Sequence, residues 1–133
     1  MSNYKGTVIE ESLKNKEILK KLHITSTRVE KVTDAHETPW ISQWTLDDFE
    51  VLEQDAETTA EELSKSLDSN HGASWYVDFK NKMYHYIIFR DKVFCVDRKN
   101  KEQYDEAESY GRSLGIPAHQ LINYEGEYKD AIK

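Results

Sequence analysis

Apolar and polar positions alternate most clearly between residues 74 and 98, where the sequence is SWYVDFKNKMYHYIIFRDKVFCVDR. Three runs of β-branched and aromatic residues are separated there by the polar pairs Asn81-Lys82 and Asp91-Lys92. Such runs are typical of strands, and Asn tolerates the positive φ that a two-residue hairpin turn requires. The stretch therefore predicts an antiparallel meander of three strands, with turns at 81–82 and 91–92.

The predicted meander has two different faces, because residues paired across a two-residue turn lie on the same side of a sheet. The first face is apolar along its length and is expected to join the core, with Trp75, Val77, Phe79, Tyr86 and Ile88 buried. The second face is apolar at one end only, through Tyr76, Ile87, Phe89, Phe94 and Val96. Its other end is expected to bring together Asp78, His85 and Arg98.

The rest of the chain alternates between strand and helix patterns. We expect strands at 5–10, 23–32 and 40–52, although the alternation in 23–32 is weak. Helices are expected at 11–22, 55–67 and 100–114, the last with Asn100 as its N-cap. Residues 118–133 are weakly patterned and are expected to form a partly flexible tail.

This order of elements, β-α-β-β-α-β followed by two strands and a helix, is typical of the ferredoxin-like plait. We therefore expect one α+β domain over residues 1–133, built on an antiparallel sheet with helices mainly on one face. In this arrangement the C-terminal meander and helix extend a ferredoxin-like βαββαβ core. The last helix either extends the helical layer or covers the second face of the sheet.

Charge changes the picture of which partners the protein takes. Charged residues make up 32% of the 133 residues and the net charge is −7, which is typical of a globular, soluble chain. Residues 34–70 carry eleven carboxylates against the single Lys65. This acidic segment argues against nucleic-acid binding, because phosphate contacts come from lysine and arginine. It favours a solubilising surface, and it leaves open a basic protein partner or mimicry of nucleic acid.

The sequence also indicates a compartment. The first residues lack the apolar run of a signal peptide, and no stretch is long and apolar enough for a membrane span. Cys95 is the single cysteine, so no internal disulfide is expected, and its apolar neighbours predict a buried structural thiol. We therefore expect a cytoplasmic protein without a membrane partner.

Four strings in the chain are distinctive beyond their composition: TPWISQWTL, SWYVDFKN, HYIIFRDKVFCVDR and YGRSLGIP. Through them, most of the chain resembles a family of small bacterial and archaeal proteins to which no activity is assigned. The resemblance implies a prokaryotic, cytoplasmic origin. It carries no functional residue over to this sequence.

The first candidate site is the polar end of the meander. Asp78 and His85 together form a candidate acid–base pair, and Arg98 is a candidate for holding an anion. A carboxylate beside an imidazole stabilises its charged form and fixes its tautomer. The alternative is a cross-strand polar ladder on a partly exposed face, and we favour this alternative because the sequence places no nucleophile beside the pair.

The second candidate site is a surface for a ligand or a partner. Trp40 follows a proline turn, His36 precedes it, and Tyr76 lies on the second face of the meander. Aromatic rings of this kind can stack on a base, a sugar or a partner's side chain. The five histidines are scattered without HxH, HExxH or CxxC spacing, so we expect no metal and no cofactor.

These observations favour a non-catalytic binding or protein-interaction module that associates as a homodimer through a sheet edge or an aromatic face. The first alternative is a small enzyme that uses the Asp78/His85 pair. The second is an acidic inhibitor that imitates nucleic acid. Phosphate-loop, dinucleotide and nucleophile-elbow motifs are absent from the sequence.

Overall fold

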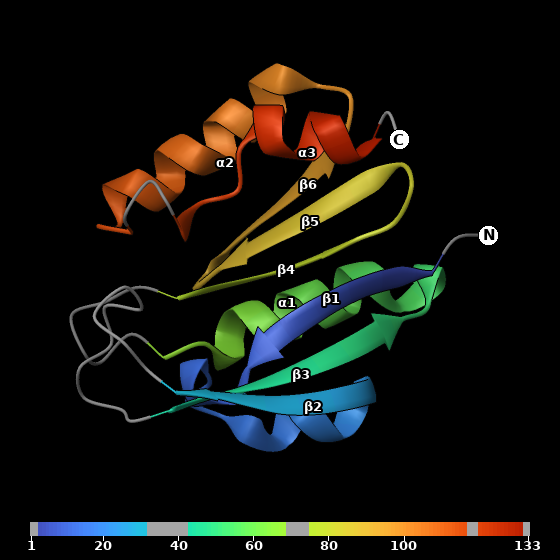
Figure 1. Ribbon diagram of the computed structural model, residues 1–133, viewed down its shortest axis with the longest axis vertical. Helices are drawn as coiled ribbons and strands as arrows, with labels where there is room; N and C mark the ends of the chain where they lie inside the picture. The colour runs from blue at the N-terminus through green and yellow to red at the C-terminus, as the bar shows by residue number, and fades with distance from the viewer. Residues whose placement is uncertain (1–2, 32–42, 69–74, 117–119, 132–133) are drawn as a thin grey trace.

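The computed structural model describes residues 3–31, 43–68, 75–116 and 120–131 (Figure 1). Six antiparallel strands form one sheet in the order β2-β3-β1-β4-β5-β6. The strands are β1 (Tyr4–Ile9), β2 (His23–Lys31), β3 (Gln43–Val51), β4 (Tyr76–Lys80), β5 (Tyr84–Phe89) and β6 (Lys92–Asp97). The helices are α1 (Ala56–Ser66), α2 (Lys101–Ser113) and α3 (Tyr124–Ala131), with short 3₁₀ turns η1 (Glu10–Ser12), η2 (Lys16–Lys21) and η4 (Glu53–Asp55).

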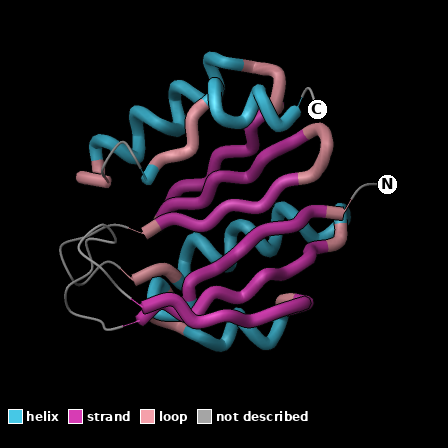
Figure 2. The backbone as a smooth tube through the Cα atoms, in the orientation of Figure 1, coloured by secondary structure: helices cyan, strands magenta, loops and turns pink. Residues whose placement is uncertain are grey.

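The helices lie on both faces of the sheet (Figure 2). On the first face, α1 and η2 pack with Phe49, Phe79 and Ile88 in one hydrophobic cluster. On the second face, α2 packs with Ile87 and Phe89 in another cluster. The α+β class and the antiparallel sheet are thus confirmed, but the expected placement of helices mainly on one face is wrong. The reason is that both faces of β4–β6 are apolar, so both need a cover.

The meander is confirmed, but each turn lies one residue away from its predicted place. Lys80 pairs with His85 and Phe89 pairs with Lys92, which places the two-residue loops at 82–83 and 90–91. The Asn81 side chain accepts hydrogen bonds from the backbone N–H groups of Met83 and Tyr84, so it begins the first turn instead of occupying its centre. The pairing therefore shifts by two residues, which leaves every side chain on its predicted face.

The predicted burial of the first face is also confirmed. Val77, Phe79 and Ile88 are at most 2% exposed, Trp75 is buried and Tyr86 is half-buried. Cys95 is the exception, because it is exposed and not a buried thiol. It lies on β6, the last strand of the sheet.

The first crossover is not the α-helix predicted at 11–22. Two 3₁₀ turns take its place, and the backbone between them is held by α1: Leu13 and Leu67 form a β-bridge, and the N–H of Lys14 donates to the Ser66 carbonyl at 2.7 Å. These bonds fix an extended conformation at Leu13 that an α-helix does not allow. The helices predicted at 55–67 and 100–114 do form, and the Asn100 side chain accepts the N–H of Gln103 at 3.2 Å.

The two halves of the sheet join where β1 meets β4. Gly6 lies opposite Phe79, and a Cβ atom at residue 6 would collide with the carbonyl oxygen of Asp78. A glycine is needed here because the two backbones approach closely. The joint places β1 and β3 beside the polar end of the meander.

Among the described residues, no helix has the length and apolar character needed to cross a membrane. A cytoplasmic location stays a prediction.

Candidate functional site

The polar end of the meander is a buried hydrogen-bonded network centred on His85. The imidazole is completely buried, and its Nε2 atom lies 2.7 Å from Asp78 Oδ2. The two residues come from neighbouring strands, β5 and β4, and share the second face of the sheet. The contact predicted from the sequence is therefore present in the structure.

Two residues that the sequence did not place in this network come from the C-terminal helices. The Nδ1 atom of His85 lies 3.1 Å from the Tyr104 hydroxyl of α2 and 3.2 Å from Glu127 Oε1 of α3. Lys80 Nζ lies 3.0 Å from the other oxygen of Glu127. The side chain of His85 thus links two strands and two helices.

The sequence carries one signal for the helix that supplies Glu127. Asn123 lies directly before α3, and its side chain accepts a hydrogen bond from the N–H of Gly126 at 2.8 Å. Asn is a common N-cap residue, and its side chain typically accepts a backbone N–H two or three residues further along the helix. Residues 124–131, which the weak pattern placed in a tail, therefore form a helix docked on the sheet.

Arg98 is buried in the same region, and among the described residues its Nε atom has no hydrogen-bond partner, so a role in holding an anion stays a prediction. Its guanidinium Nη1 donates to the Asn81 carbonyl at 2.8 Å, and its N–H donates to the Met83 carbonyl, so it closes the β4–β5 turn. The pKa of the Tyr104 hydroxyl is raised to about 12, mainly by burial and next by the negative charge of Glu127. Arg98 has the opposite effect and lowers this pKa. The hydroxyl is thus a proton-bearing member of the network.

The network is poorly placed for acid–base catalysis on an external substrate. A general base must come within hydrogen-bond reach of the proton it removes. Here the imidazole has no exposed surface, and each ring nitrogen already faces a carboxylate or a hydroxyl group. Asp78 is the accessible member of the pair, with a side chain that is 34% exposed.

Three residues of the network are also potential metal ligands. Among the described residues, Asp78, His85 and Glu127 form a group whose ligand atoms lie within 4.8 Å of one another. Asp78 and Glu127 contact different ring nitrogens, and Lys80 already neutralises Glu127. A metal ion would have to displace these contacts, so the geometry favours a hydrogen-bonded network over a metal site.

An open polar groove of about 570 Å³ lies beside the network, on the second face of β1 and β3. Asp78 and Lys80 form one wall, and Thr7, Asp48 and Thr25 lie along the rest. Asp48 is the centre of this surface: its carboxylate accepts hydrogen bonds from Thr7 at 2.6 Å and Ser26 at 2.8 Å, and pairs with Arg28 at 3.0 Å. These three hydrogen bonds lower the pKa of Asp48 to about 2.

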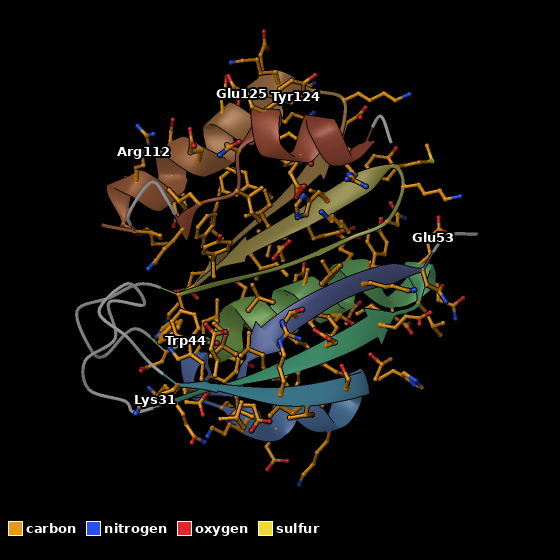
Figure 3. All side chains as sticks on the ribbon, viewed as in Figure 1. Lys31, Trp44, Glu53, Arg112, Tyr124 and Glu125 are labelled. Carbon is orange, nitrogen blue, oxygen red and sulfur yellow. The ribbon has the colours of Figure 1, made fainter. Side chains whose placement is uncertain are left out.

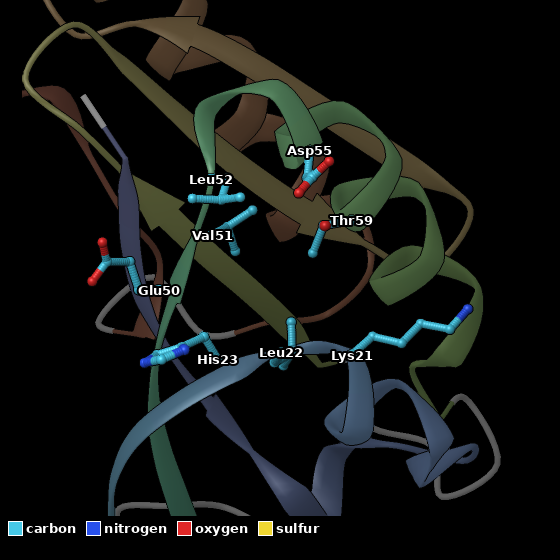
Figure 4. Close-up of a pocket in the computed structure, with 8 residues that line it drawn as sticks. All are labelled: Lys21, Leu22, His23, Glu50, Val51, Leu52, Asp55 and Thr59. Atoms are coloured by element: carbon cyan, nitrogen blue, oxygen red, sulfur yellow. The ribbon is translucent and has the colours of Figure 1, made fainter. Parts of the chain in front are cut away.

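A second pocket, of about 380 Å³, lies at the start of α1 (Figure 4). Its floor is apolar, through Leu22, Val51 and Leu52, and Lys21 lies at its rim. The ammonium group of Lys21 lies 3.3 Å from Glu62, so this cation is already paired. The other lining residues are polar: His23, Glu50, Asp55 and Thr59.

The candidates for ligand or partner binding are only partly within the described structure. His36 and Trp40 lie outside the described residues. Tyr76 is half-buried against Phe89, and its hydroxyl donates to the backbone carbonyl of Gln120. Its role in binding stays a prediction. Trp44 lies at the start of β3 (Figure 3) and packs edge-on against Trp75, with ring centroids 5.6 Å apart.

No sequence pattern predicts the carboxyl pair that the buried Asp47 forms with the half-buried Glu10 on the first face. Asp47 is 1% exposed; its Oδ1 accepts the Thr27 hydroxyl at 2.6 Å, and its Oδ2 has no hydrogen-bond donor other than a protonated acid. The pKa of Glu10 is raised to about 7, mainly by a hydrogen bond with Asp47. Burial and the negative charges of Asp47 and Glu11 also raise this pKa, and the positive charge of Lys16 lowers it. A protonated Glu10 supplies the donor that the Asp47 carboxylate lacks.

This pair predicts a pH dependence of stability. The ordinary pKa of Glu10 is 4.5, so between about pH 4.5 and 7 the folded protein holds a proton that the unfolded chain has lost. The contribution of this proton to the free energy of unfolding is therefore full below this window and falls as the pH rises through it. Glu10→Gln keeps a donor without titrating and should remove that fall.

Urea unfolding at a series of pH values between 5 and 8 would measure the effect. The matched control is Glu61→Gln, at an exposed position of α1, which should follow the unaltered protein at every pH. If the free energy of unfolding falls equally steeply with pH in Glu10→Gln and in the unaltered protein, Glu10 and Asp47 share no proton.

Comparison of the chain with protein-family models, with curated proteins and with solved structures finds no match. The resemblance to a prokaryotic family stays a prediction.

Proposed function

We propose that this protein is a non-catalytic interaction module that accepts an added strand at the outer edge of β2. The observation that carries the proposal is the exposure of that strand. β2 is the first strand of the sheet, and all nine of its residues, from His23 to Lys31, are exposed. An exposed edge strand offers a row of backbone donors and acceptors for pairing with another chain.

The edge is held in a strand conformation before any partner arrives. On the first face, Asp47 holds the hydroxyl of Thr27, and on the second face Asp48 holds Ser26 and Arg28. These contacts join β2 to β3 from both sides. Pre-ordering of this kind lowers the entropy that a binding partner must overcome.

β2 also carries apolar surface that a partner strand would cover. Val29 is 60% exposed and Ile24 is 38% exposed. The opposite edge, β6, is shorter, with six residues, and its Val96 is buried under α2. Of the two edges, β2 is therefore the better surface for strand addition.

The two alternatives have less support. The contact between Asp78 and His85 favours an enzyme, but the complete burial of His85 counts against it. Mimicry of nucleic acid needs free surface carboxylates, whereas Asp47, Asp48 and Glu62 are engaged by side chains of the protein itself. A basic partner for the remaining carboxylates stays a proposal.

We also infer a ferredoxin-like plait for the first four strands. The order β2-β3-β1-β4 and the antiparallel pairing of each neighbouring pair support this inference. The first crossover differs from that plait, because it consists of 3₁₀ turns and not of a helix.

A peptide panel tests strand addition without assuming a partner. Extended nine-residue peptides, including one with the sequence of residues 23–31, would be selected for binding to the immobilised protein. Val29→Lys should weaken the selected peptides at least about tenfold, because a charged residue on an edge strand discourages pairing. Fluorescence anisotropy would measure the dissociation constants.

Met83→Lys is the matched control, because Met83 is equally exposed at 63% and lies in the β4–β5 turn, away from β2. It should leave peptide binding unchanged. The proposal fails if no peptide binds, or if both substitutions weaken binding equally.

A further inference from the structure

We propose that the strand added at β2 is β2 of a second copy of this chain, paired antiparallel with Val29 on the two-fold axis. This inference rests on the proposed role of β2 as an interaction edge. In a symmetric dimer each contact occurs twice, so a strand pairs well with itself when its residues are complementary about one central position. Residues 27–31 of β2 meet that condition about Val29, with Thr27 facing Lys31 of the second copy.

In this register, Val29 faces Val29 of the second copy and Arg28 faces Glu30 of the second copy. Opposite charges in directly paired positions of an antiparallel sheet attract each other, and β-branched residues pack well there. By symmetry the dimer contains two such charge pairs around one apolar contact. Pairing would also remove from water the side chain of Val29, which is 60% exposed.

The neighbouring registers are less complementary. Centring the pair on Arg28 places the two guanidinium groups opposite each other, and like charges in this position are destabilising. Centring it on Thr27 places His23 opposite Lys31 and the apolar Ile24 opposite Glu30. The Val29 register is the one of these three that joins opposite charges.

The geometry of Arg28 is compatible with a second carboxylate. Its Nη1 atom lies 3.0 Å from Asp48 Oδ1, and the side chain is still 57% exposed. A guanidinium group has five N–H donors, so it can bind Asp48 of its own chain and Glu30 of the second copy together. Lys31, at the end of the strand, lies at the margin of the described sheet (Figure 3).

Cysteine crosslinking tests both the partner and the register. The exposed Cys95 is first replaced by serine. Val29→Cys, Thr27→Cys and Lys31→Cys are then made one at a time in this background. Residues directly opposite each other have Cα atoms about 4.5–5.5 Å apart, which a disulfide can bridge. Val29→Cys should therefore form a covalent dimer under mild oxidation, whereas Thr27→Cys and Lys31→Cys should not.

The other outcomes separate this inference from the proposed function. A dimer formed by Thr27→Cys alone would overturn the register and leave strand pairing at β2 in place. No crosslink in a protein whose mass is that of one chain would overturn the second copy as partner, with the peptide panel then deciding on strand addition. If the protein is dimeric but no variant forms a crosslink, the dimer contact lies elsewhere and this inference is overturned. Circular dichroism of each cysteine variant checks that the variant is folded.

Discussion

Replacement of His85 by alanine is expected to lower the free energy of unfolding by about 3 kcal/mol. The imidazole is completely buried and contacts Asp78 on one side and Glu127 on the other. Its removal leaves a cavity and deprives Asp78 of the imidazole, while Glu127 keeps its ion pair with Lys80. Both the cavity and the lost hydrogen bonds are destabilising. The expected loss combines the cost of the cavity with that of the lost hydrogen bonds, and it is limited because the Asp78 side chain is 34% exposed and water can partly solvate it.

Urea unfolding of His85→Ala and of the control His23→Ala would measure this loss. His23 is exposed on β2, so its replacement should change the free energy of unfolding by less than about 0.5 kcal/mol. A loss below about 1 kcal/mol for His85→Ala would be the result for an exposed cross-strand ladder. It would mean that the network does not hold α2 and α3 on the sheet.

The part of this network that the sequence predicts depends on side-chain parity. Side chains of a strand alternate with a period of two, and the real turns shift the pairing by two residues. Asp78 and His85 therefore share a face under either register. The exact turn positions were not predictable from propensity alone, because the side chain of Asn81 caps the turn from outside the loop.

The remaining members of the network depend on tertiary packing. Tyr104 lies 19 residues after His85 in the sequence, and Glu127 lies 42 residues after it. No local sequence pattern predicts that either side chain contacts β5. The pairing of Glu10 with Asp47 is of the same kind, because it requires η1 to turn back onto β3. Interactions between elements that are distant in sequence follow from the fold and not from periodicity.

The edge strand shows the opposite case, in which a weak pattern carried information. The alternation of residues 23–32 is weak, and in the structure β2 has no buried residue on either face. A strand that buries neither face has no reason to alternate. Weak alternation in a segment rich in Thr and Val was therefore the available signal for an exposed edge.

The second large effect concerns the assembly state. Val29→Lys is expected to separate the proposed dimer into single chains, because it places two ammonium groups opposite each other on the two-fold axis in place of two valines. Val29 is 60% exposed in one chain, so the same substitution should leave the fold and its stability nearly unchanged.

Multi-angle light scattering at micromolar concentrations measures this directly. We expect a mass of twice the 15.6 kDa of one chain for the unaltered protein and for Met83→Lys, and 15.6 kDa for Val29→Lys. A mass of 15.6 kDa for the unaltered protein at every concentration, or a dimer that persists in Val29→Lys, would contradict self-association through β2.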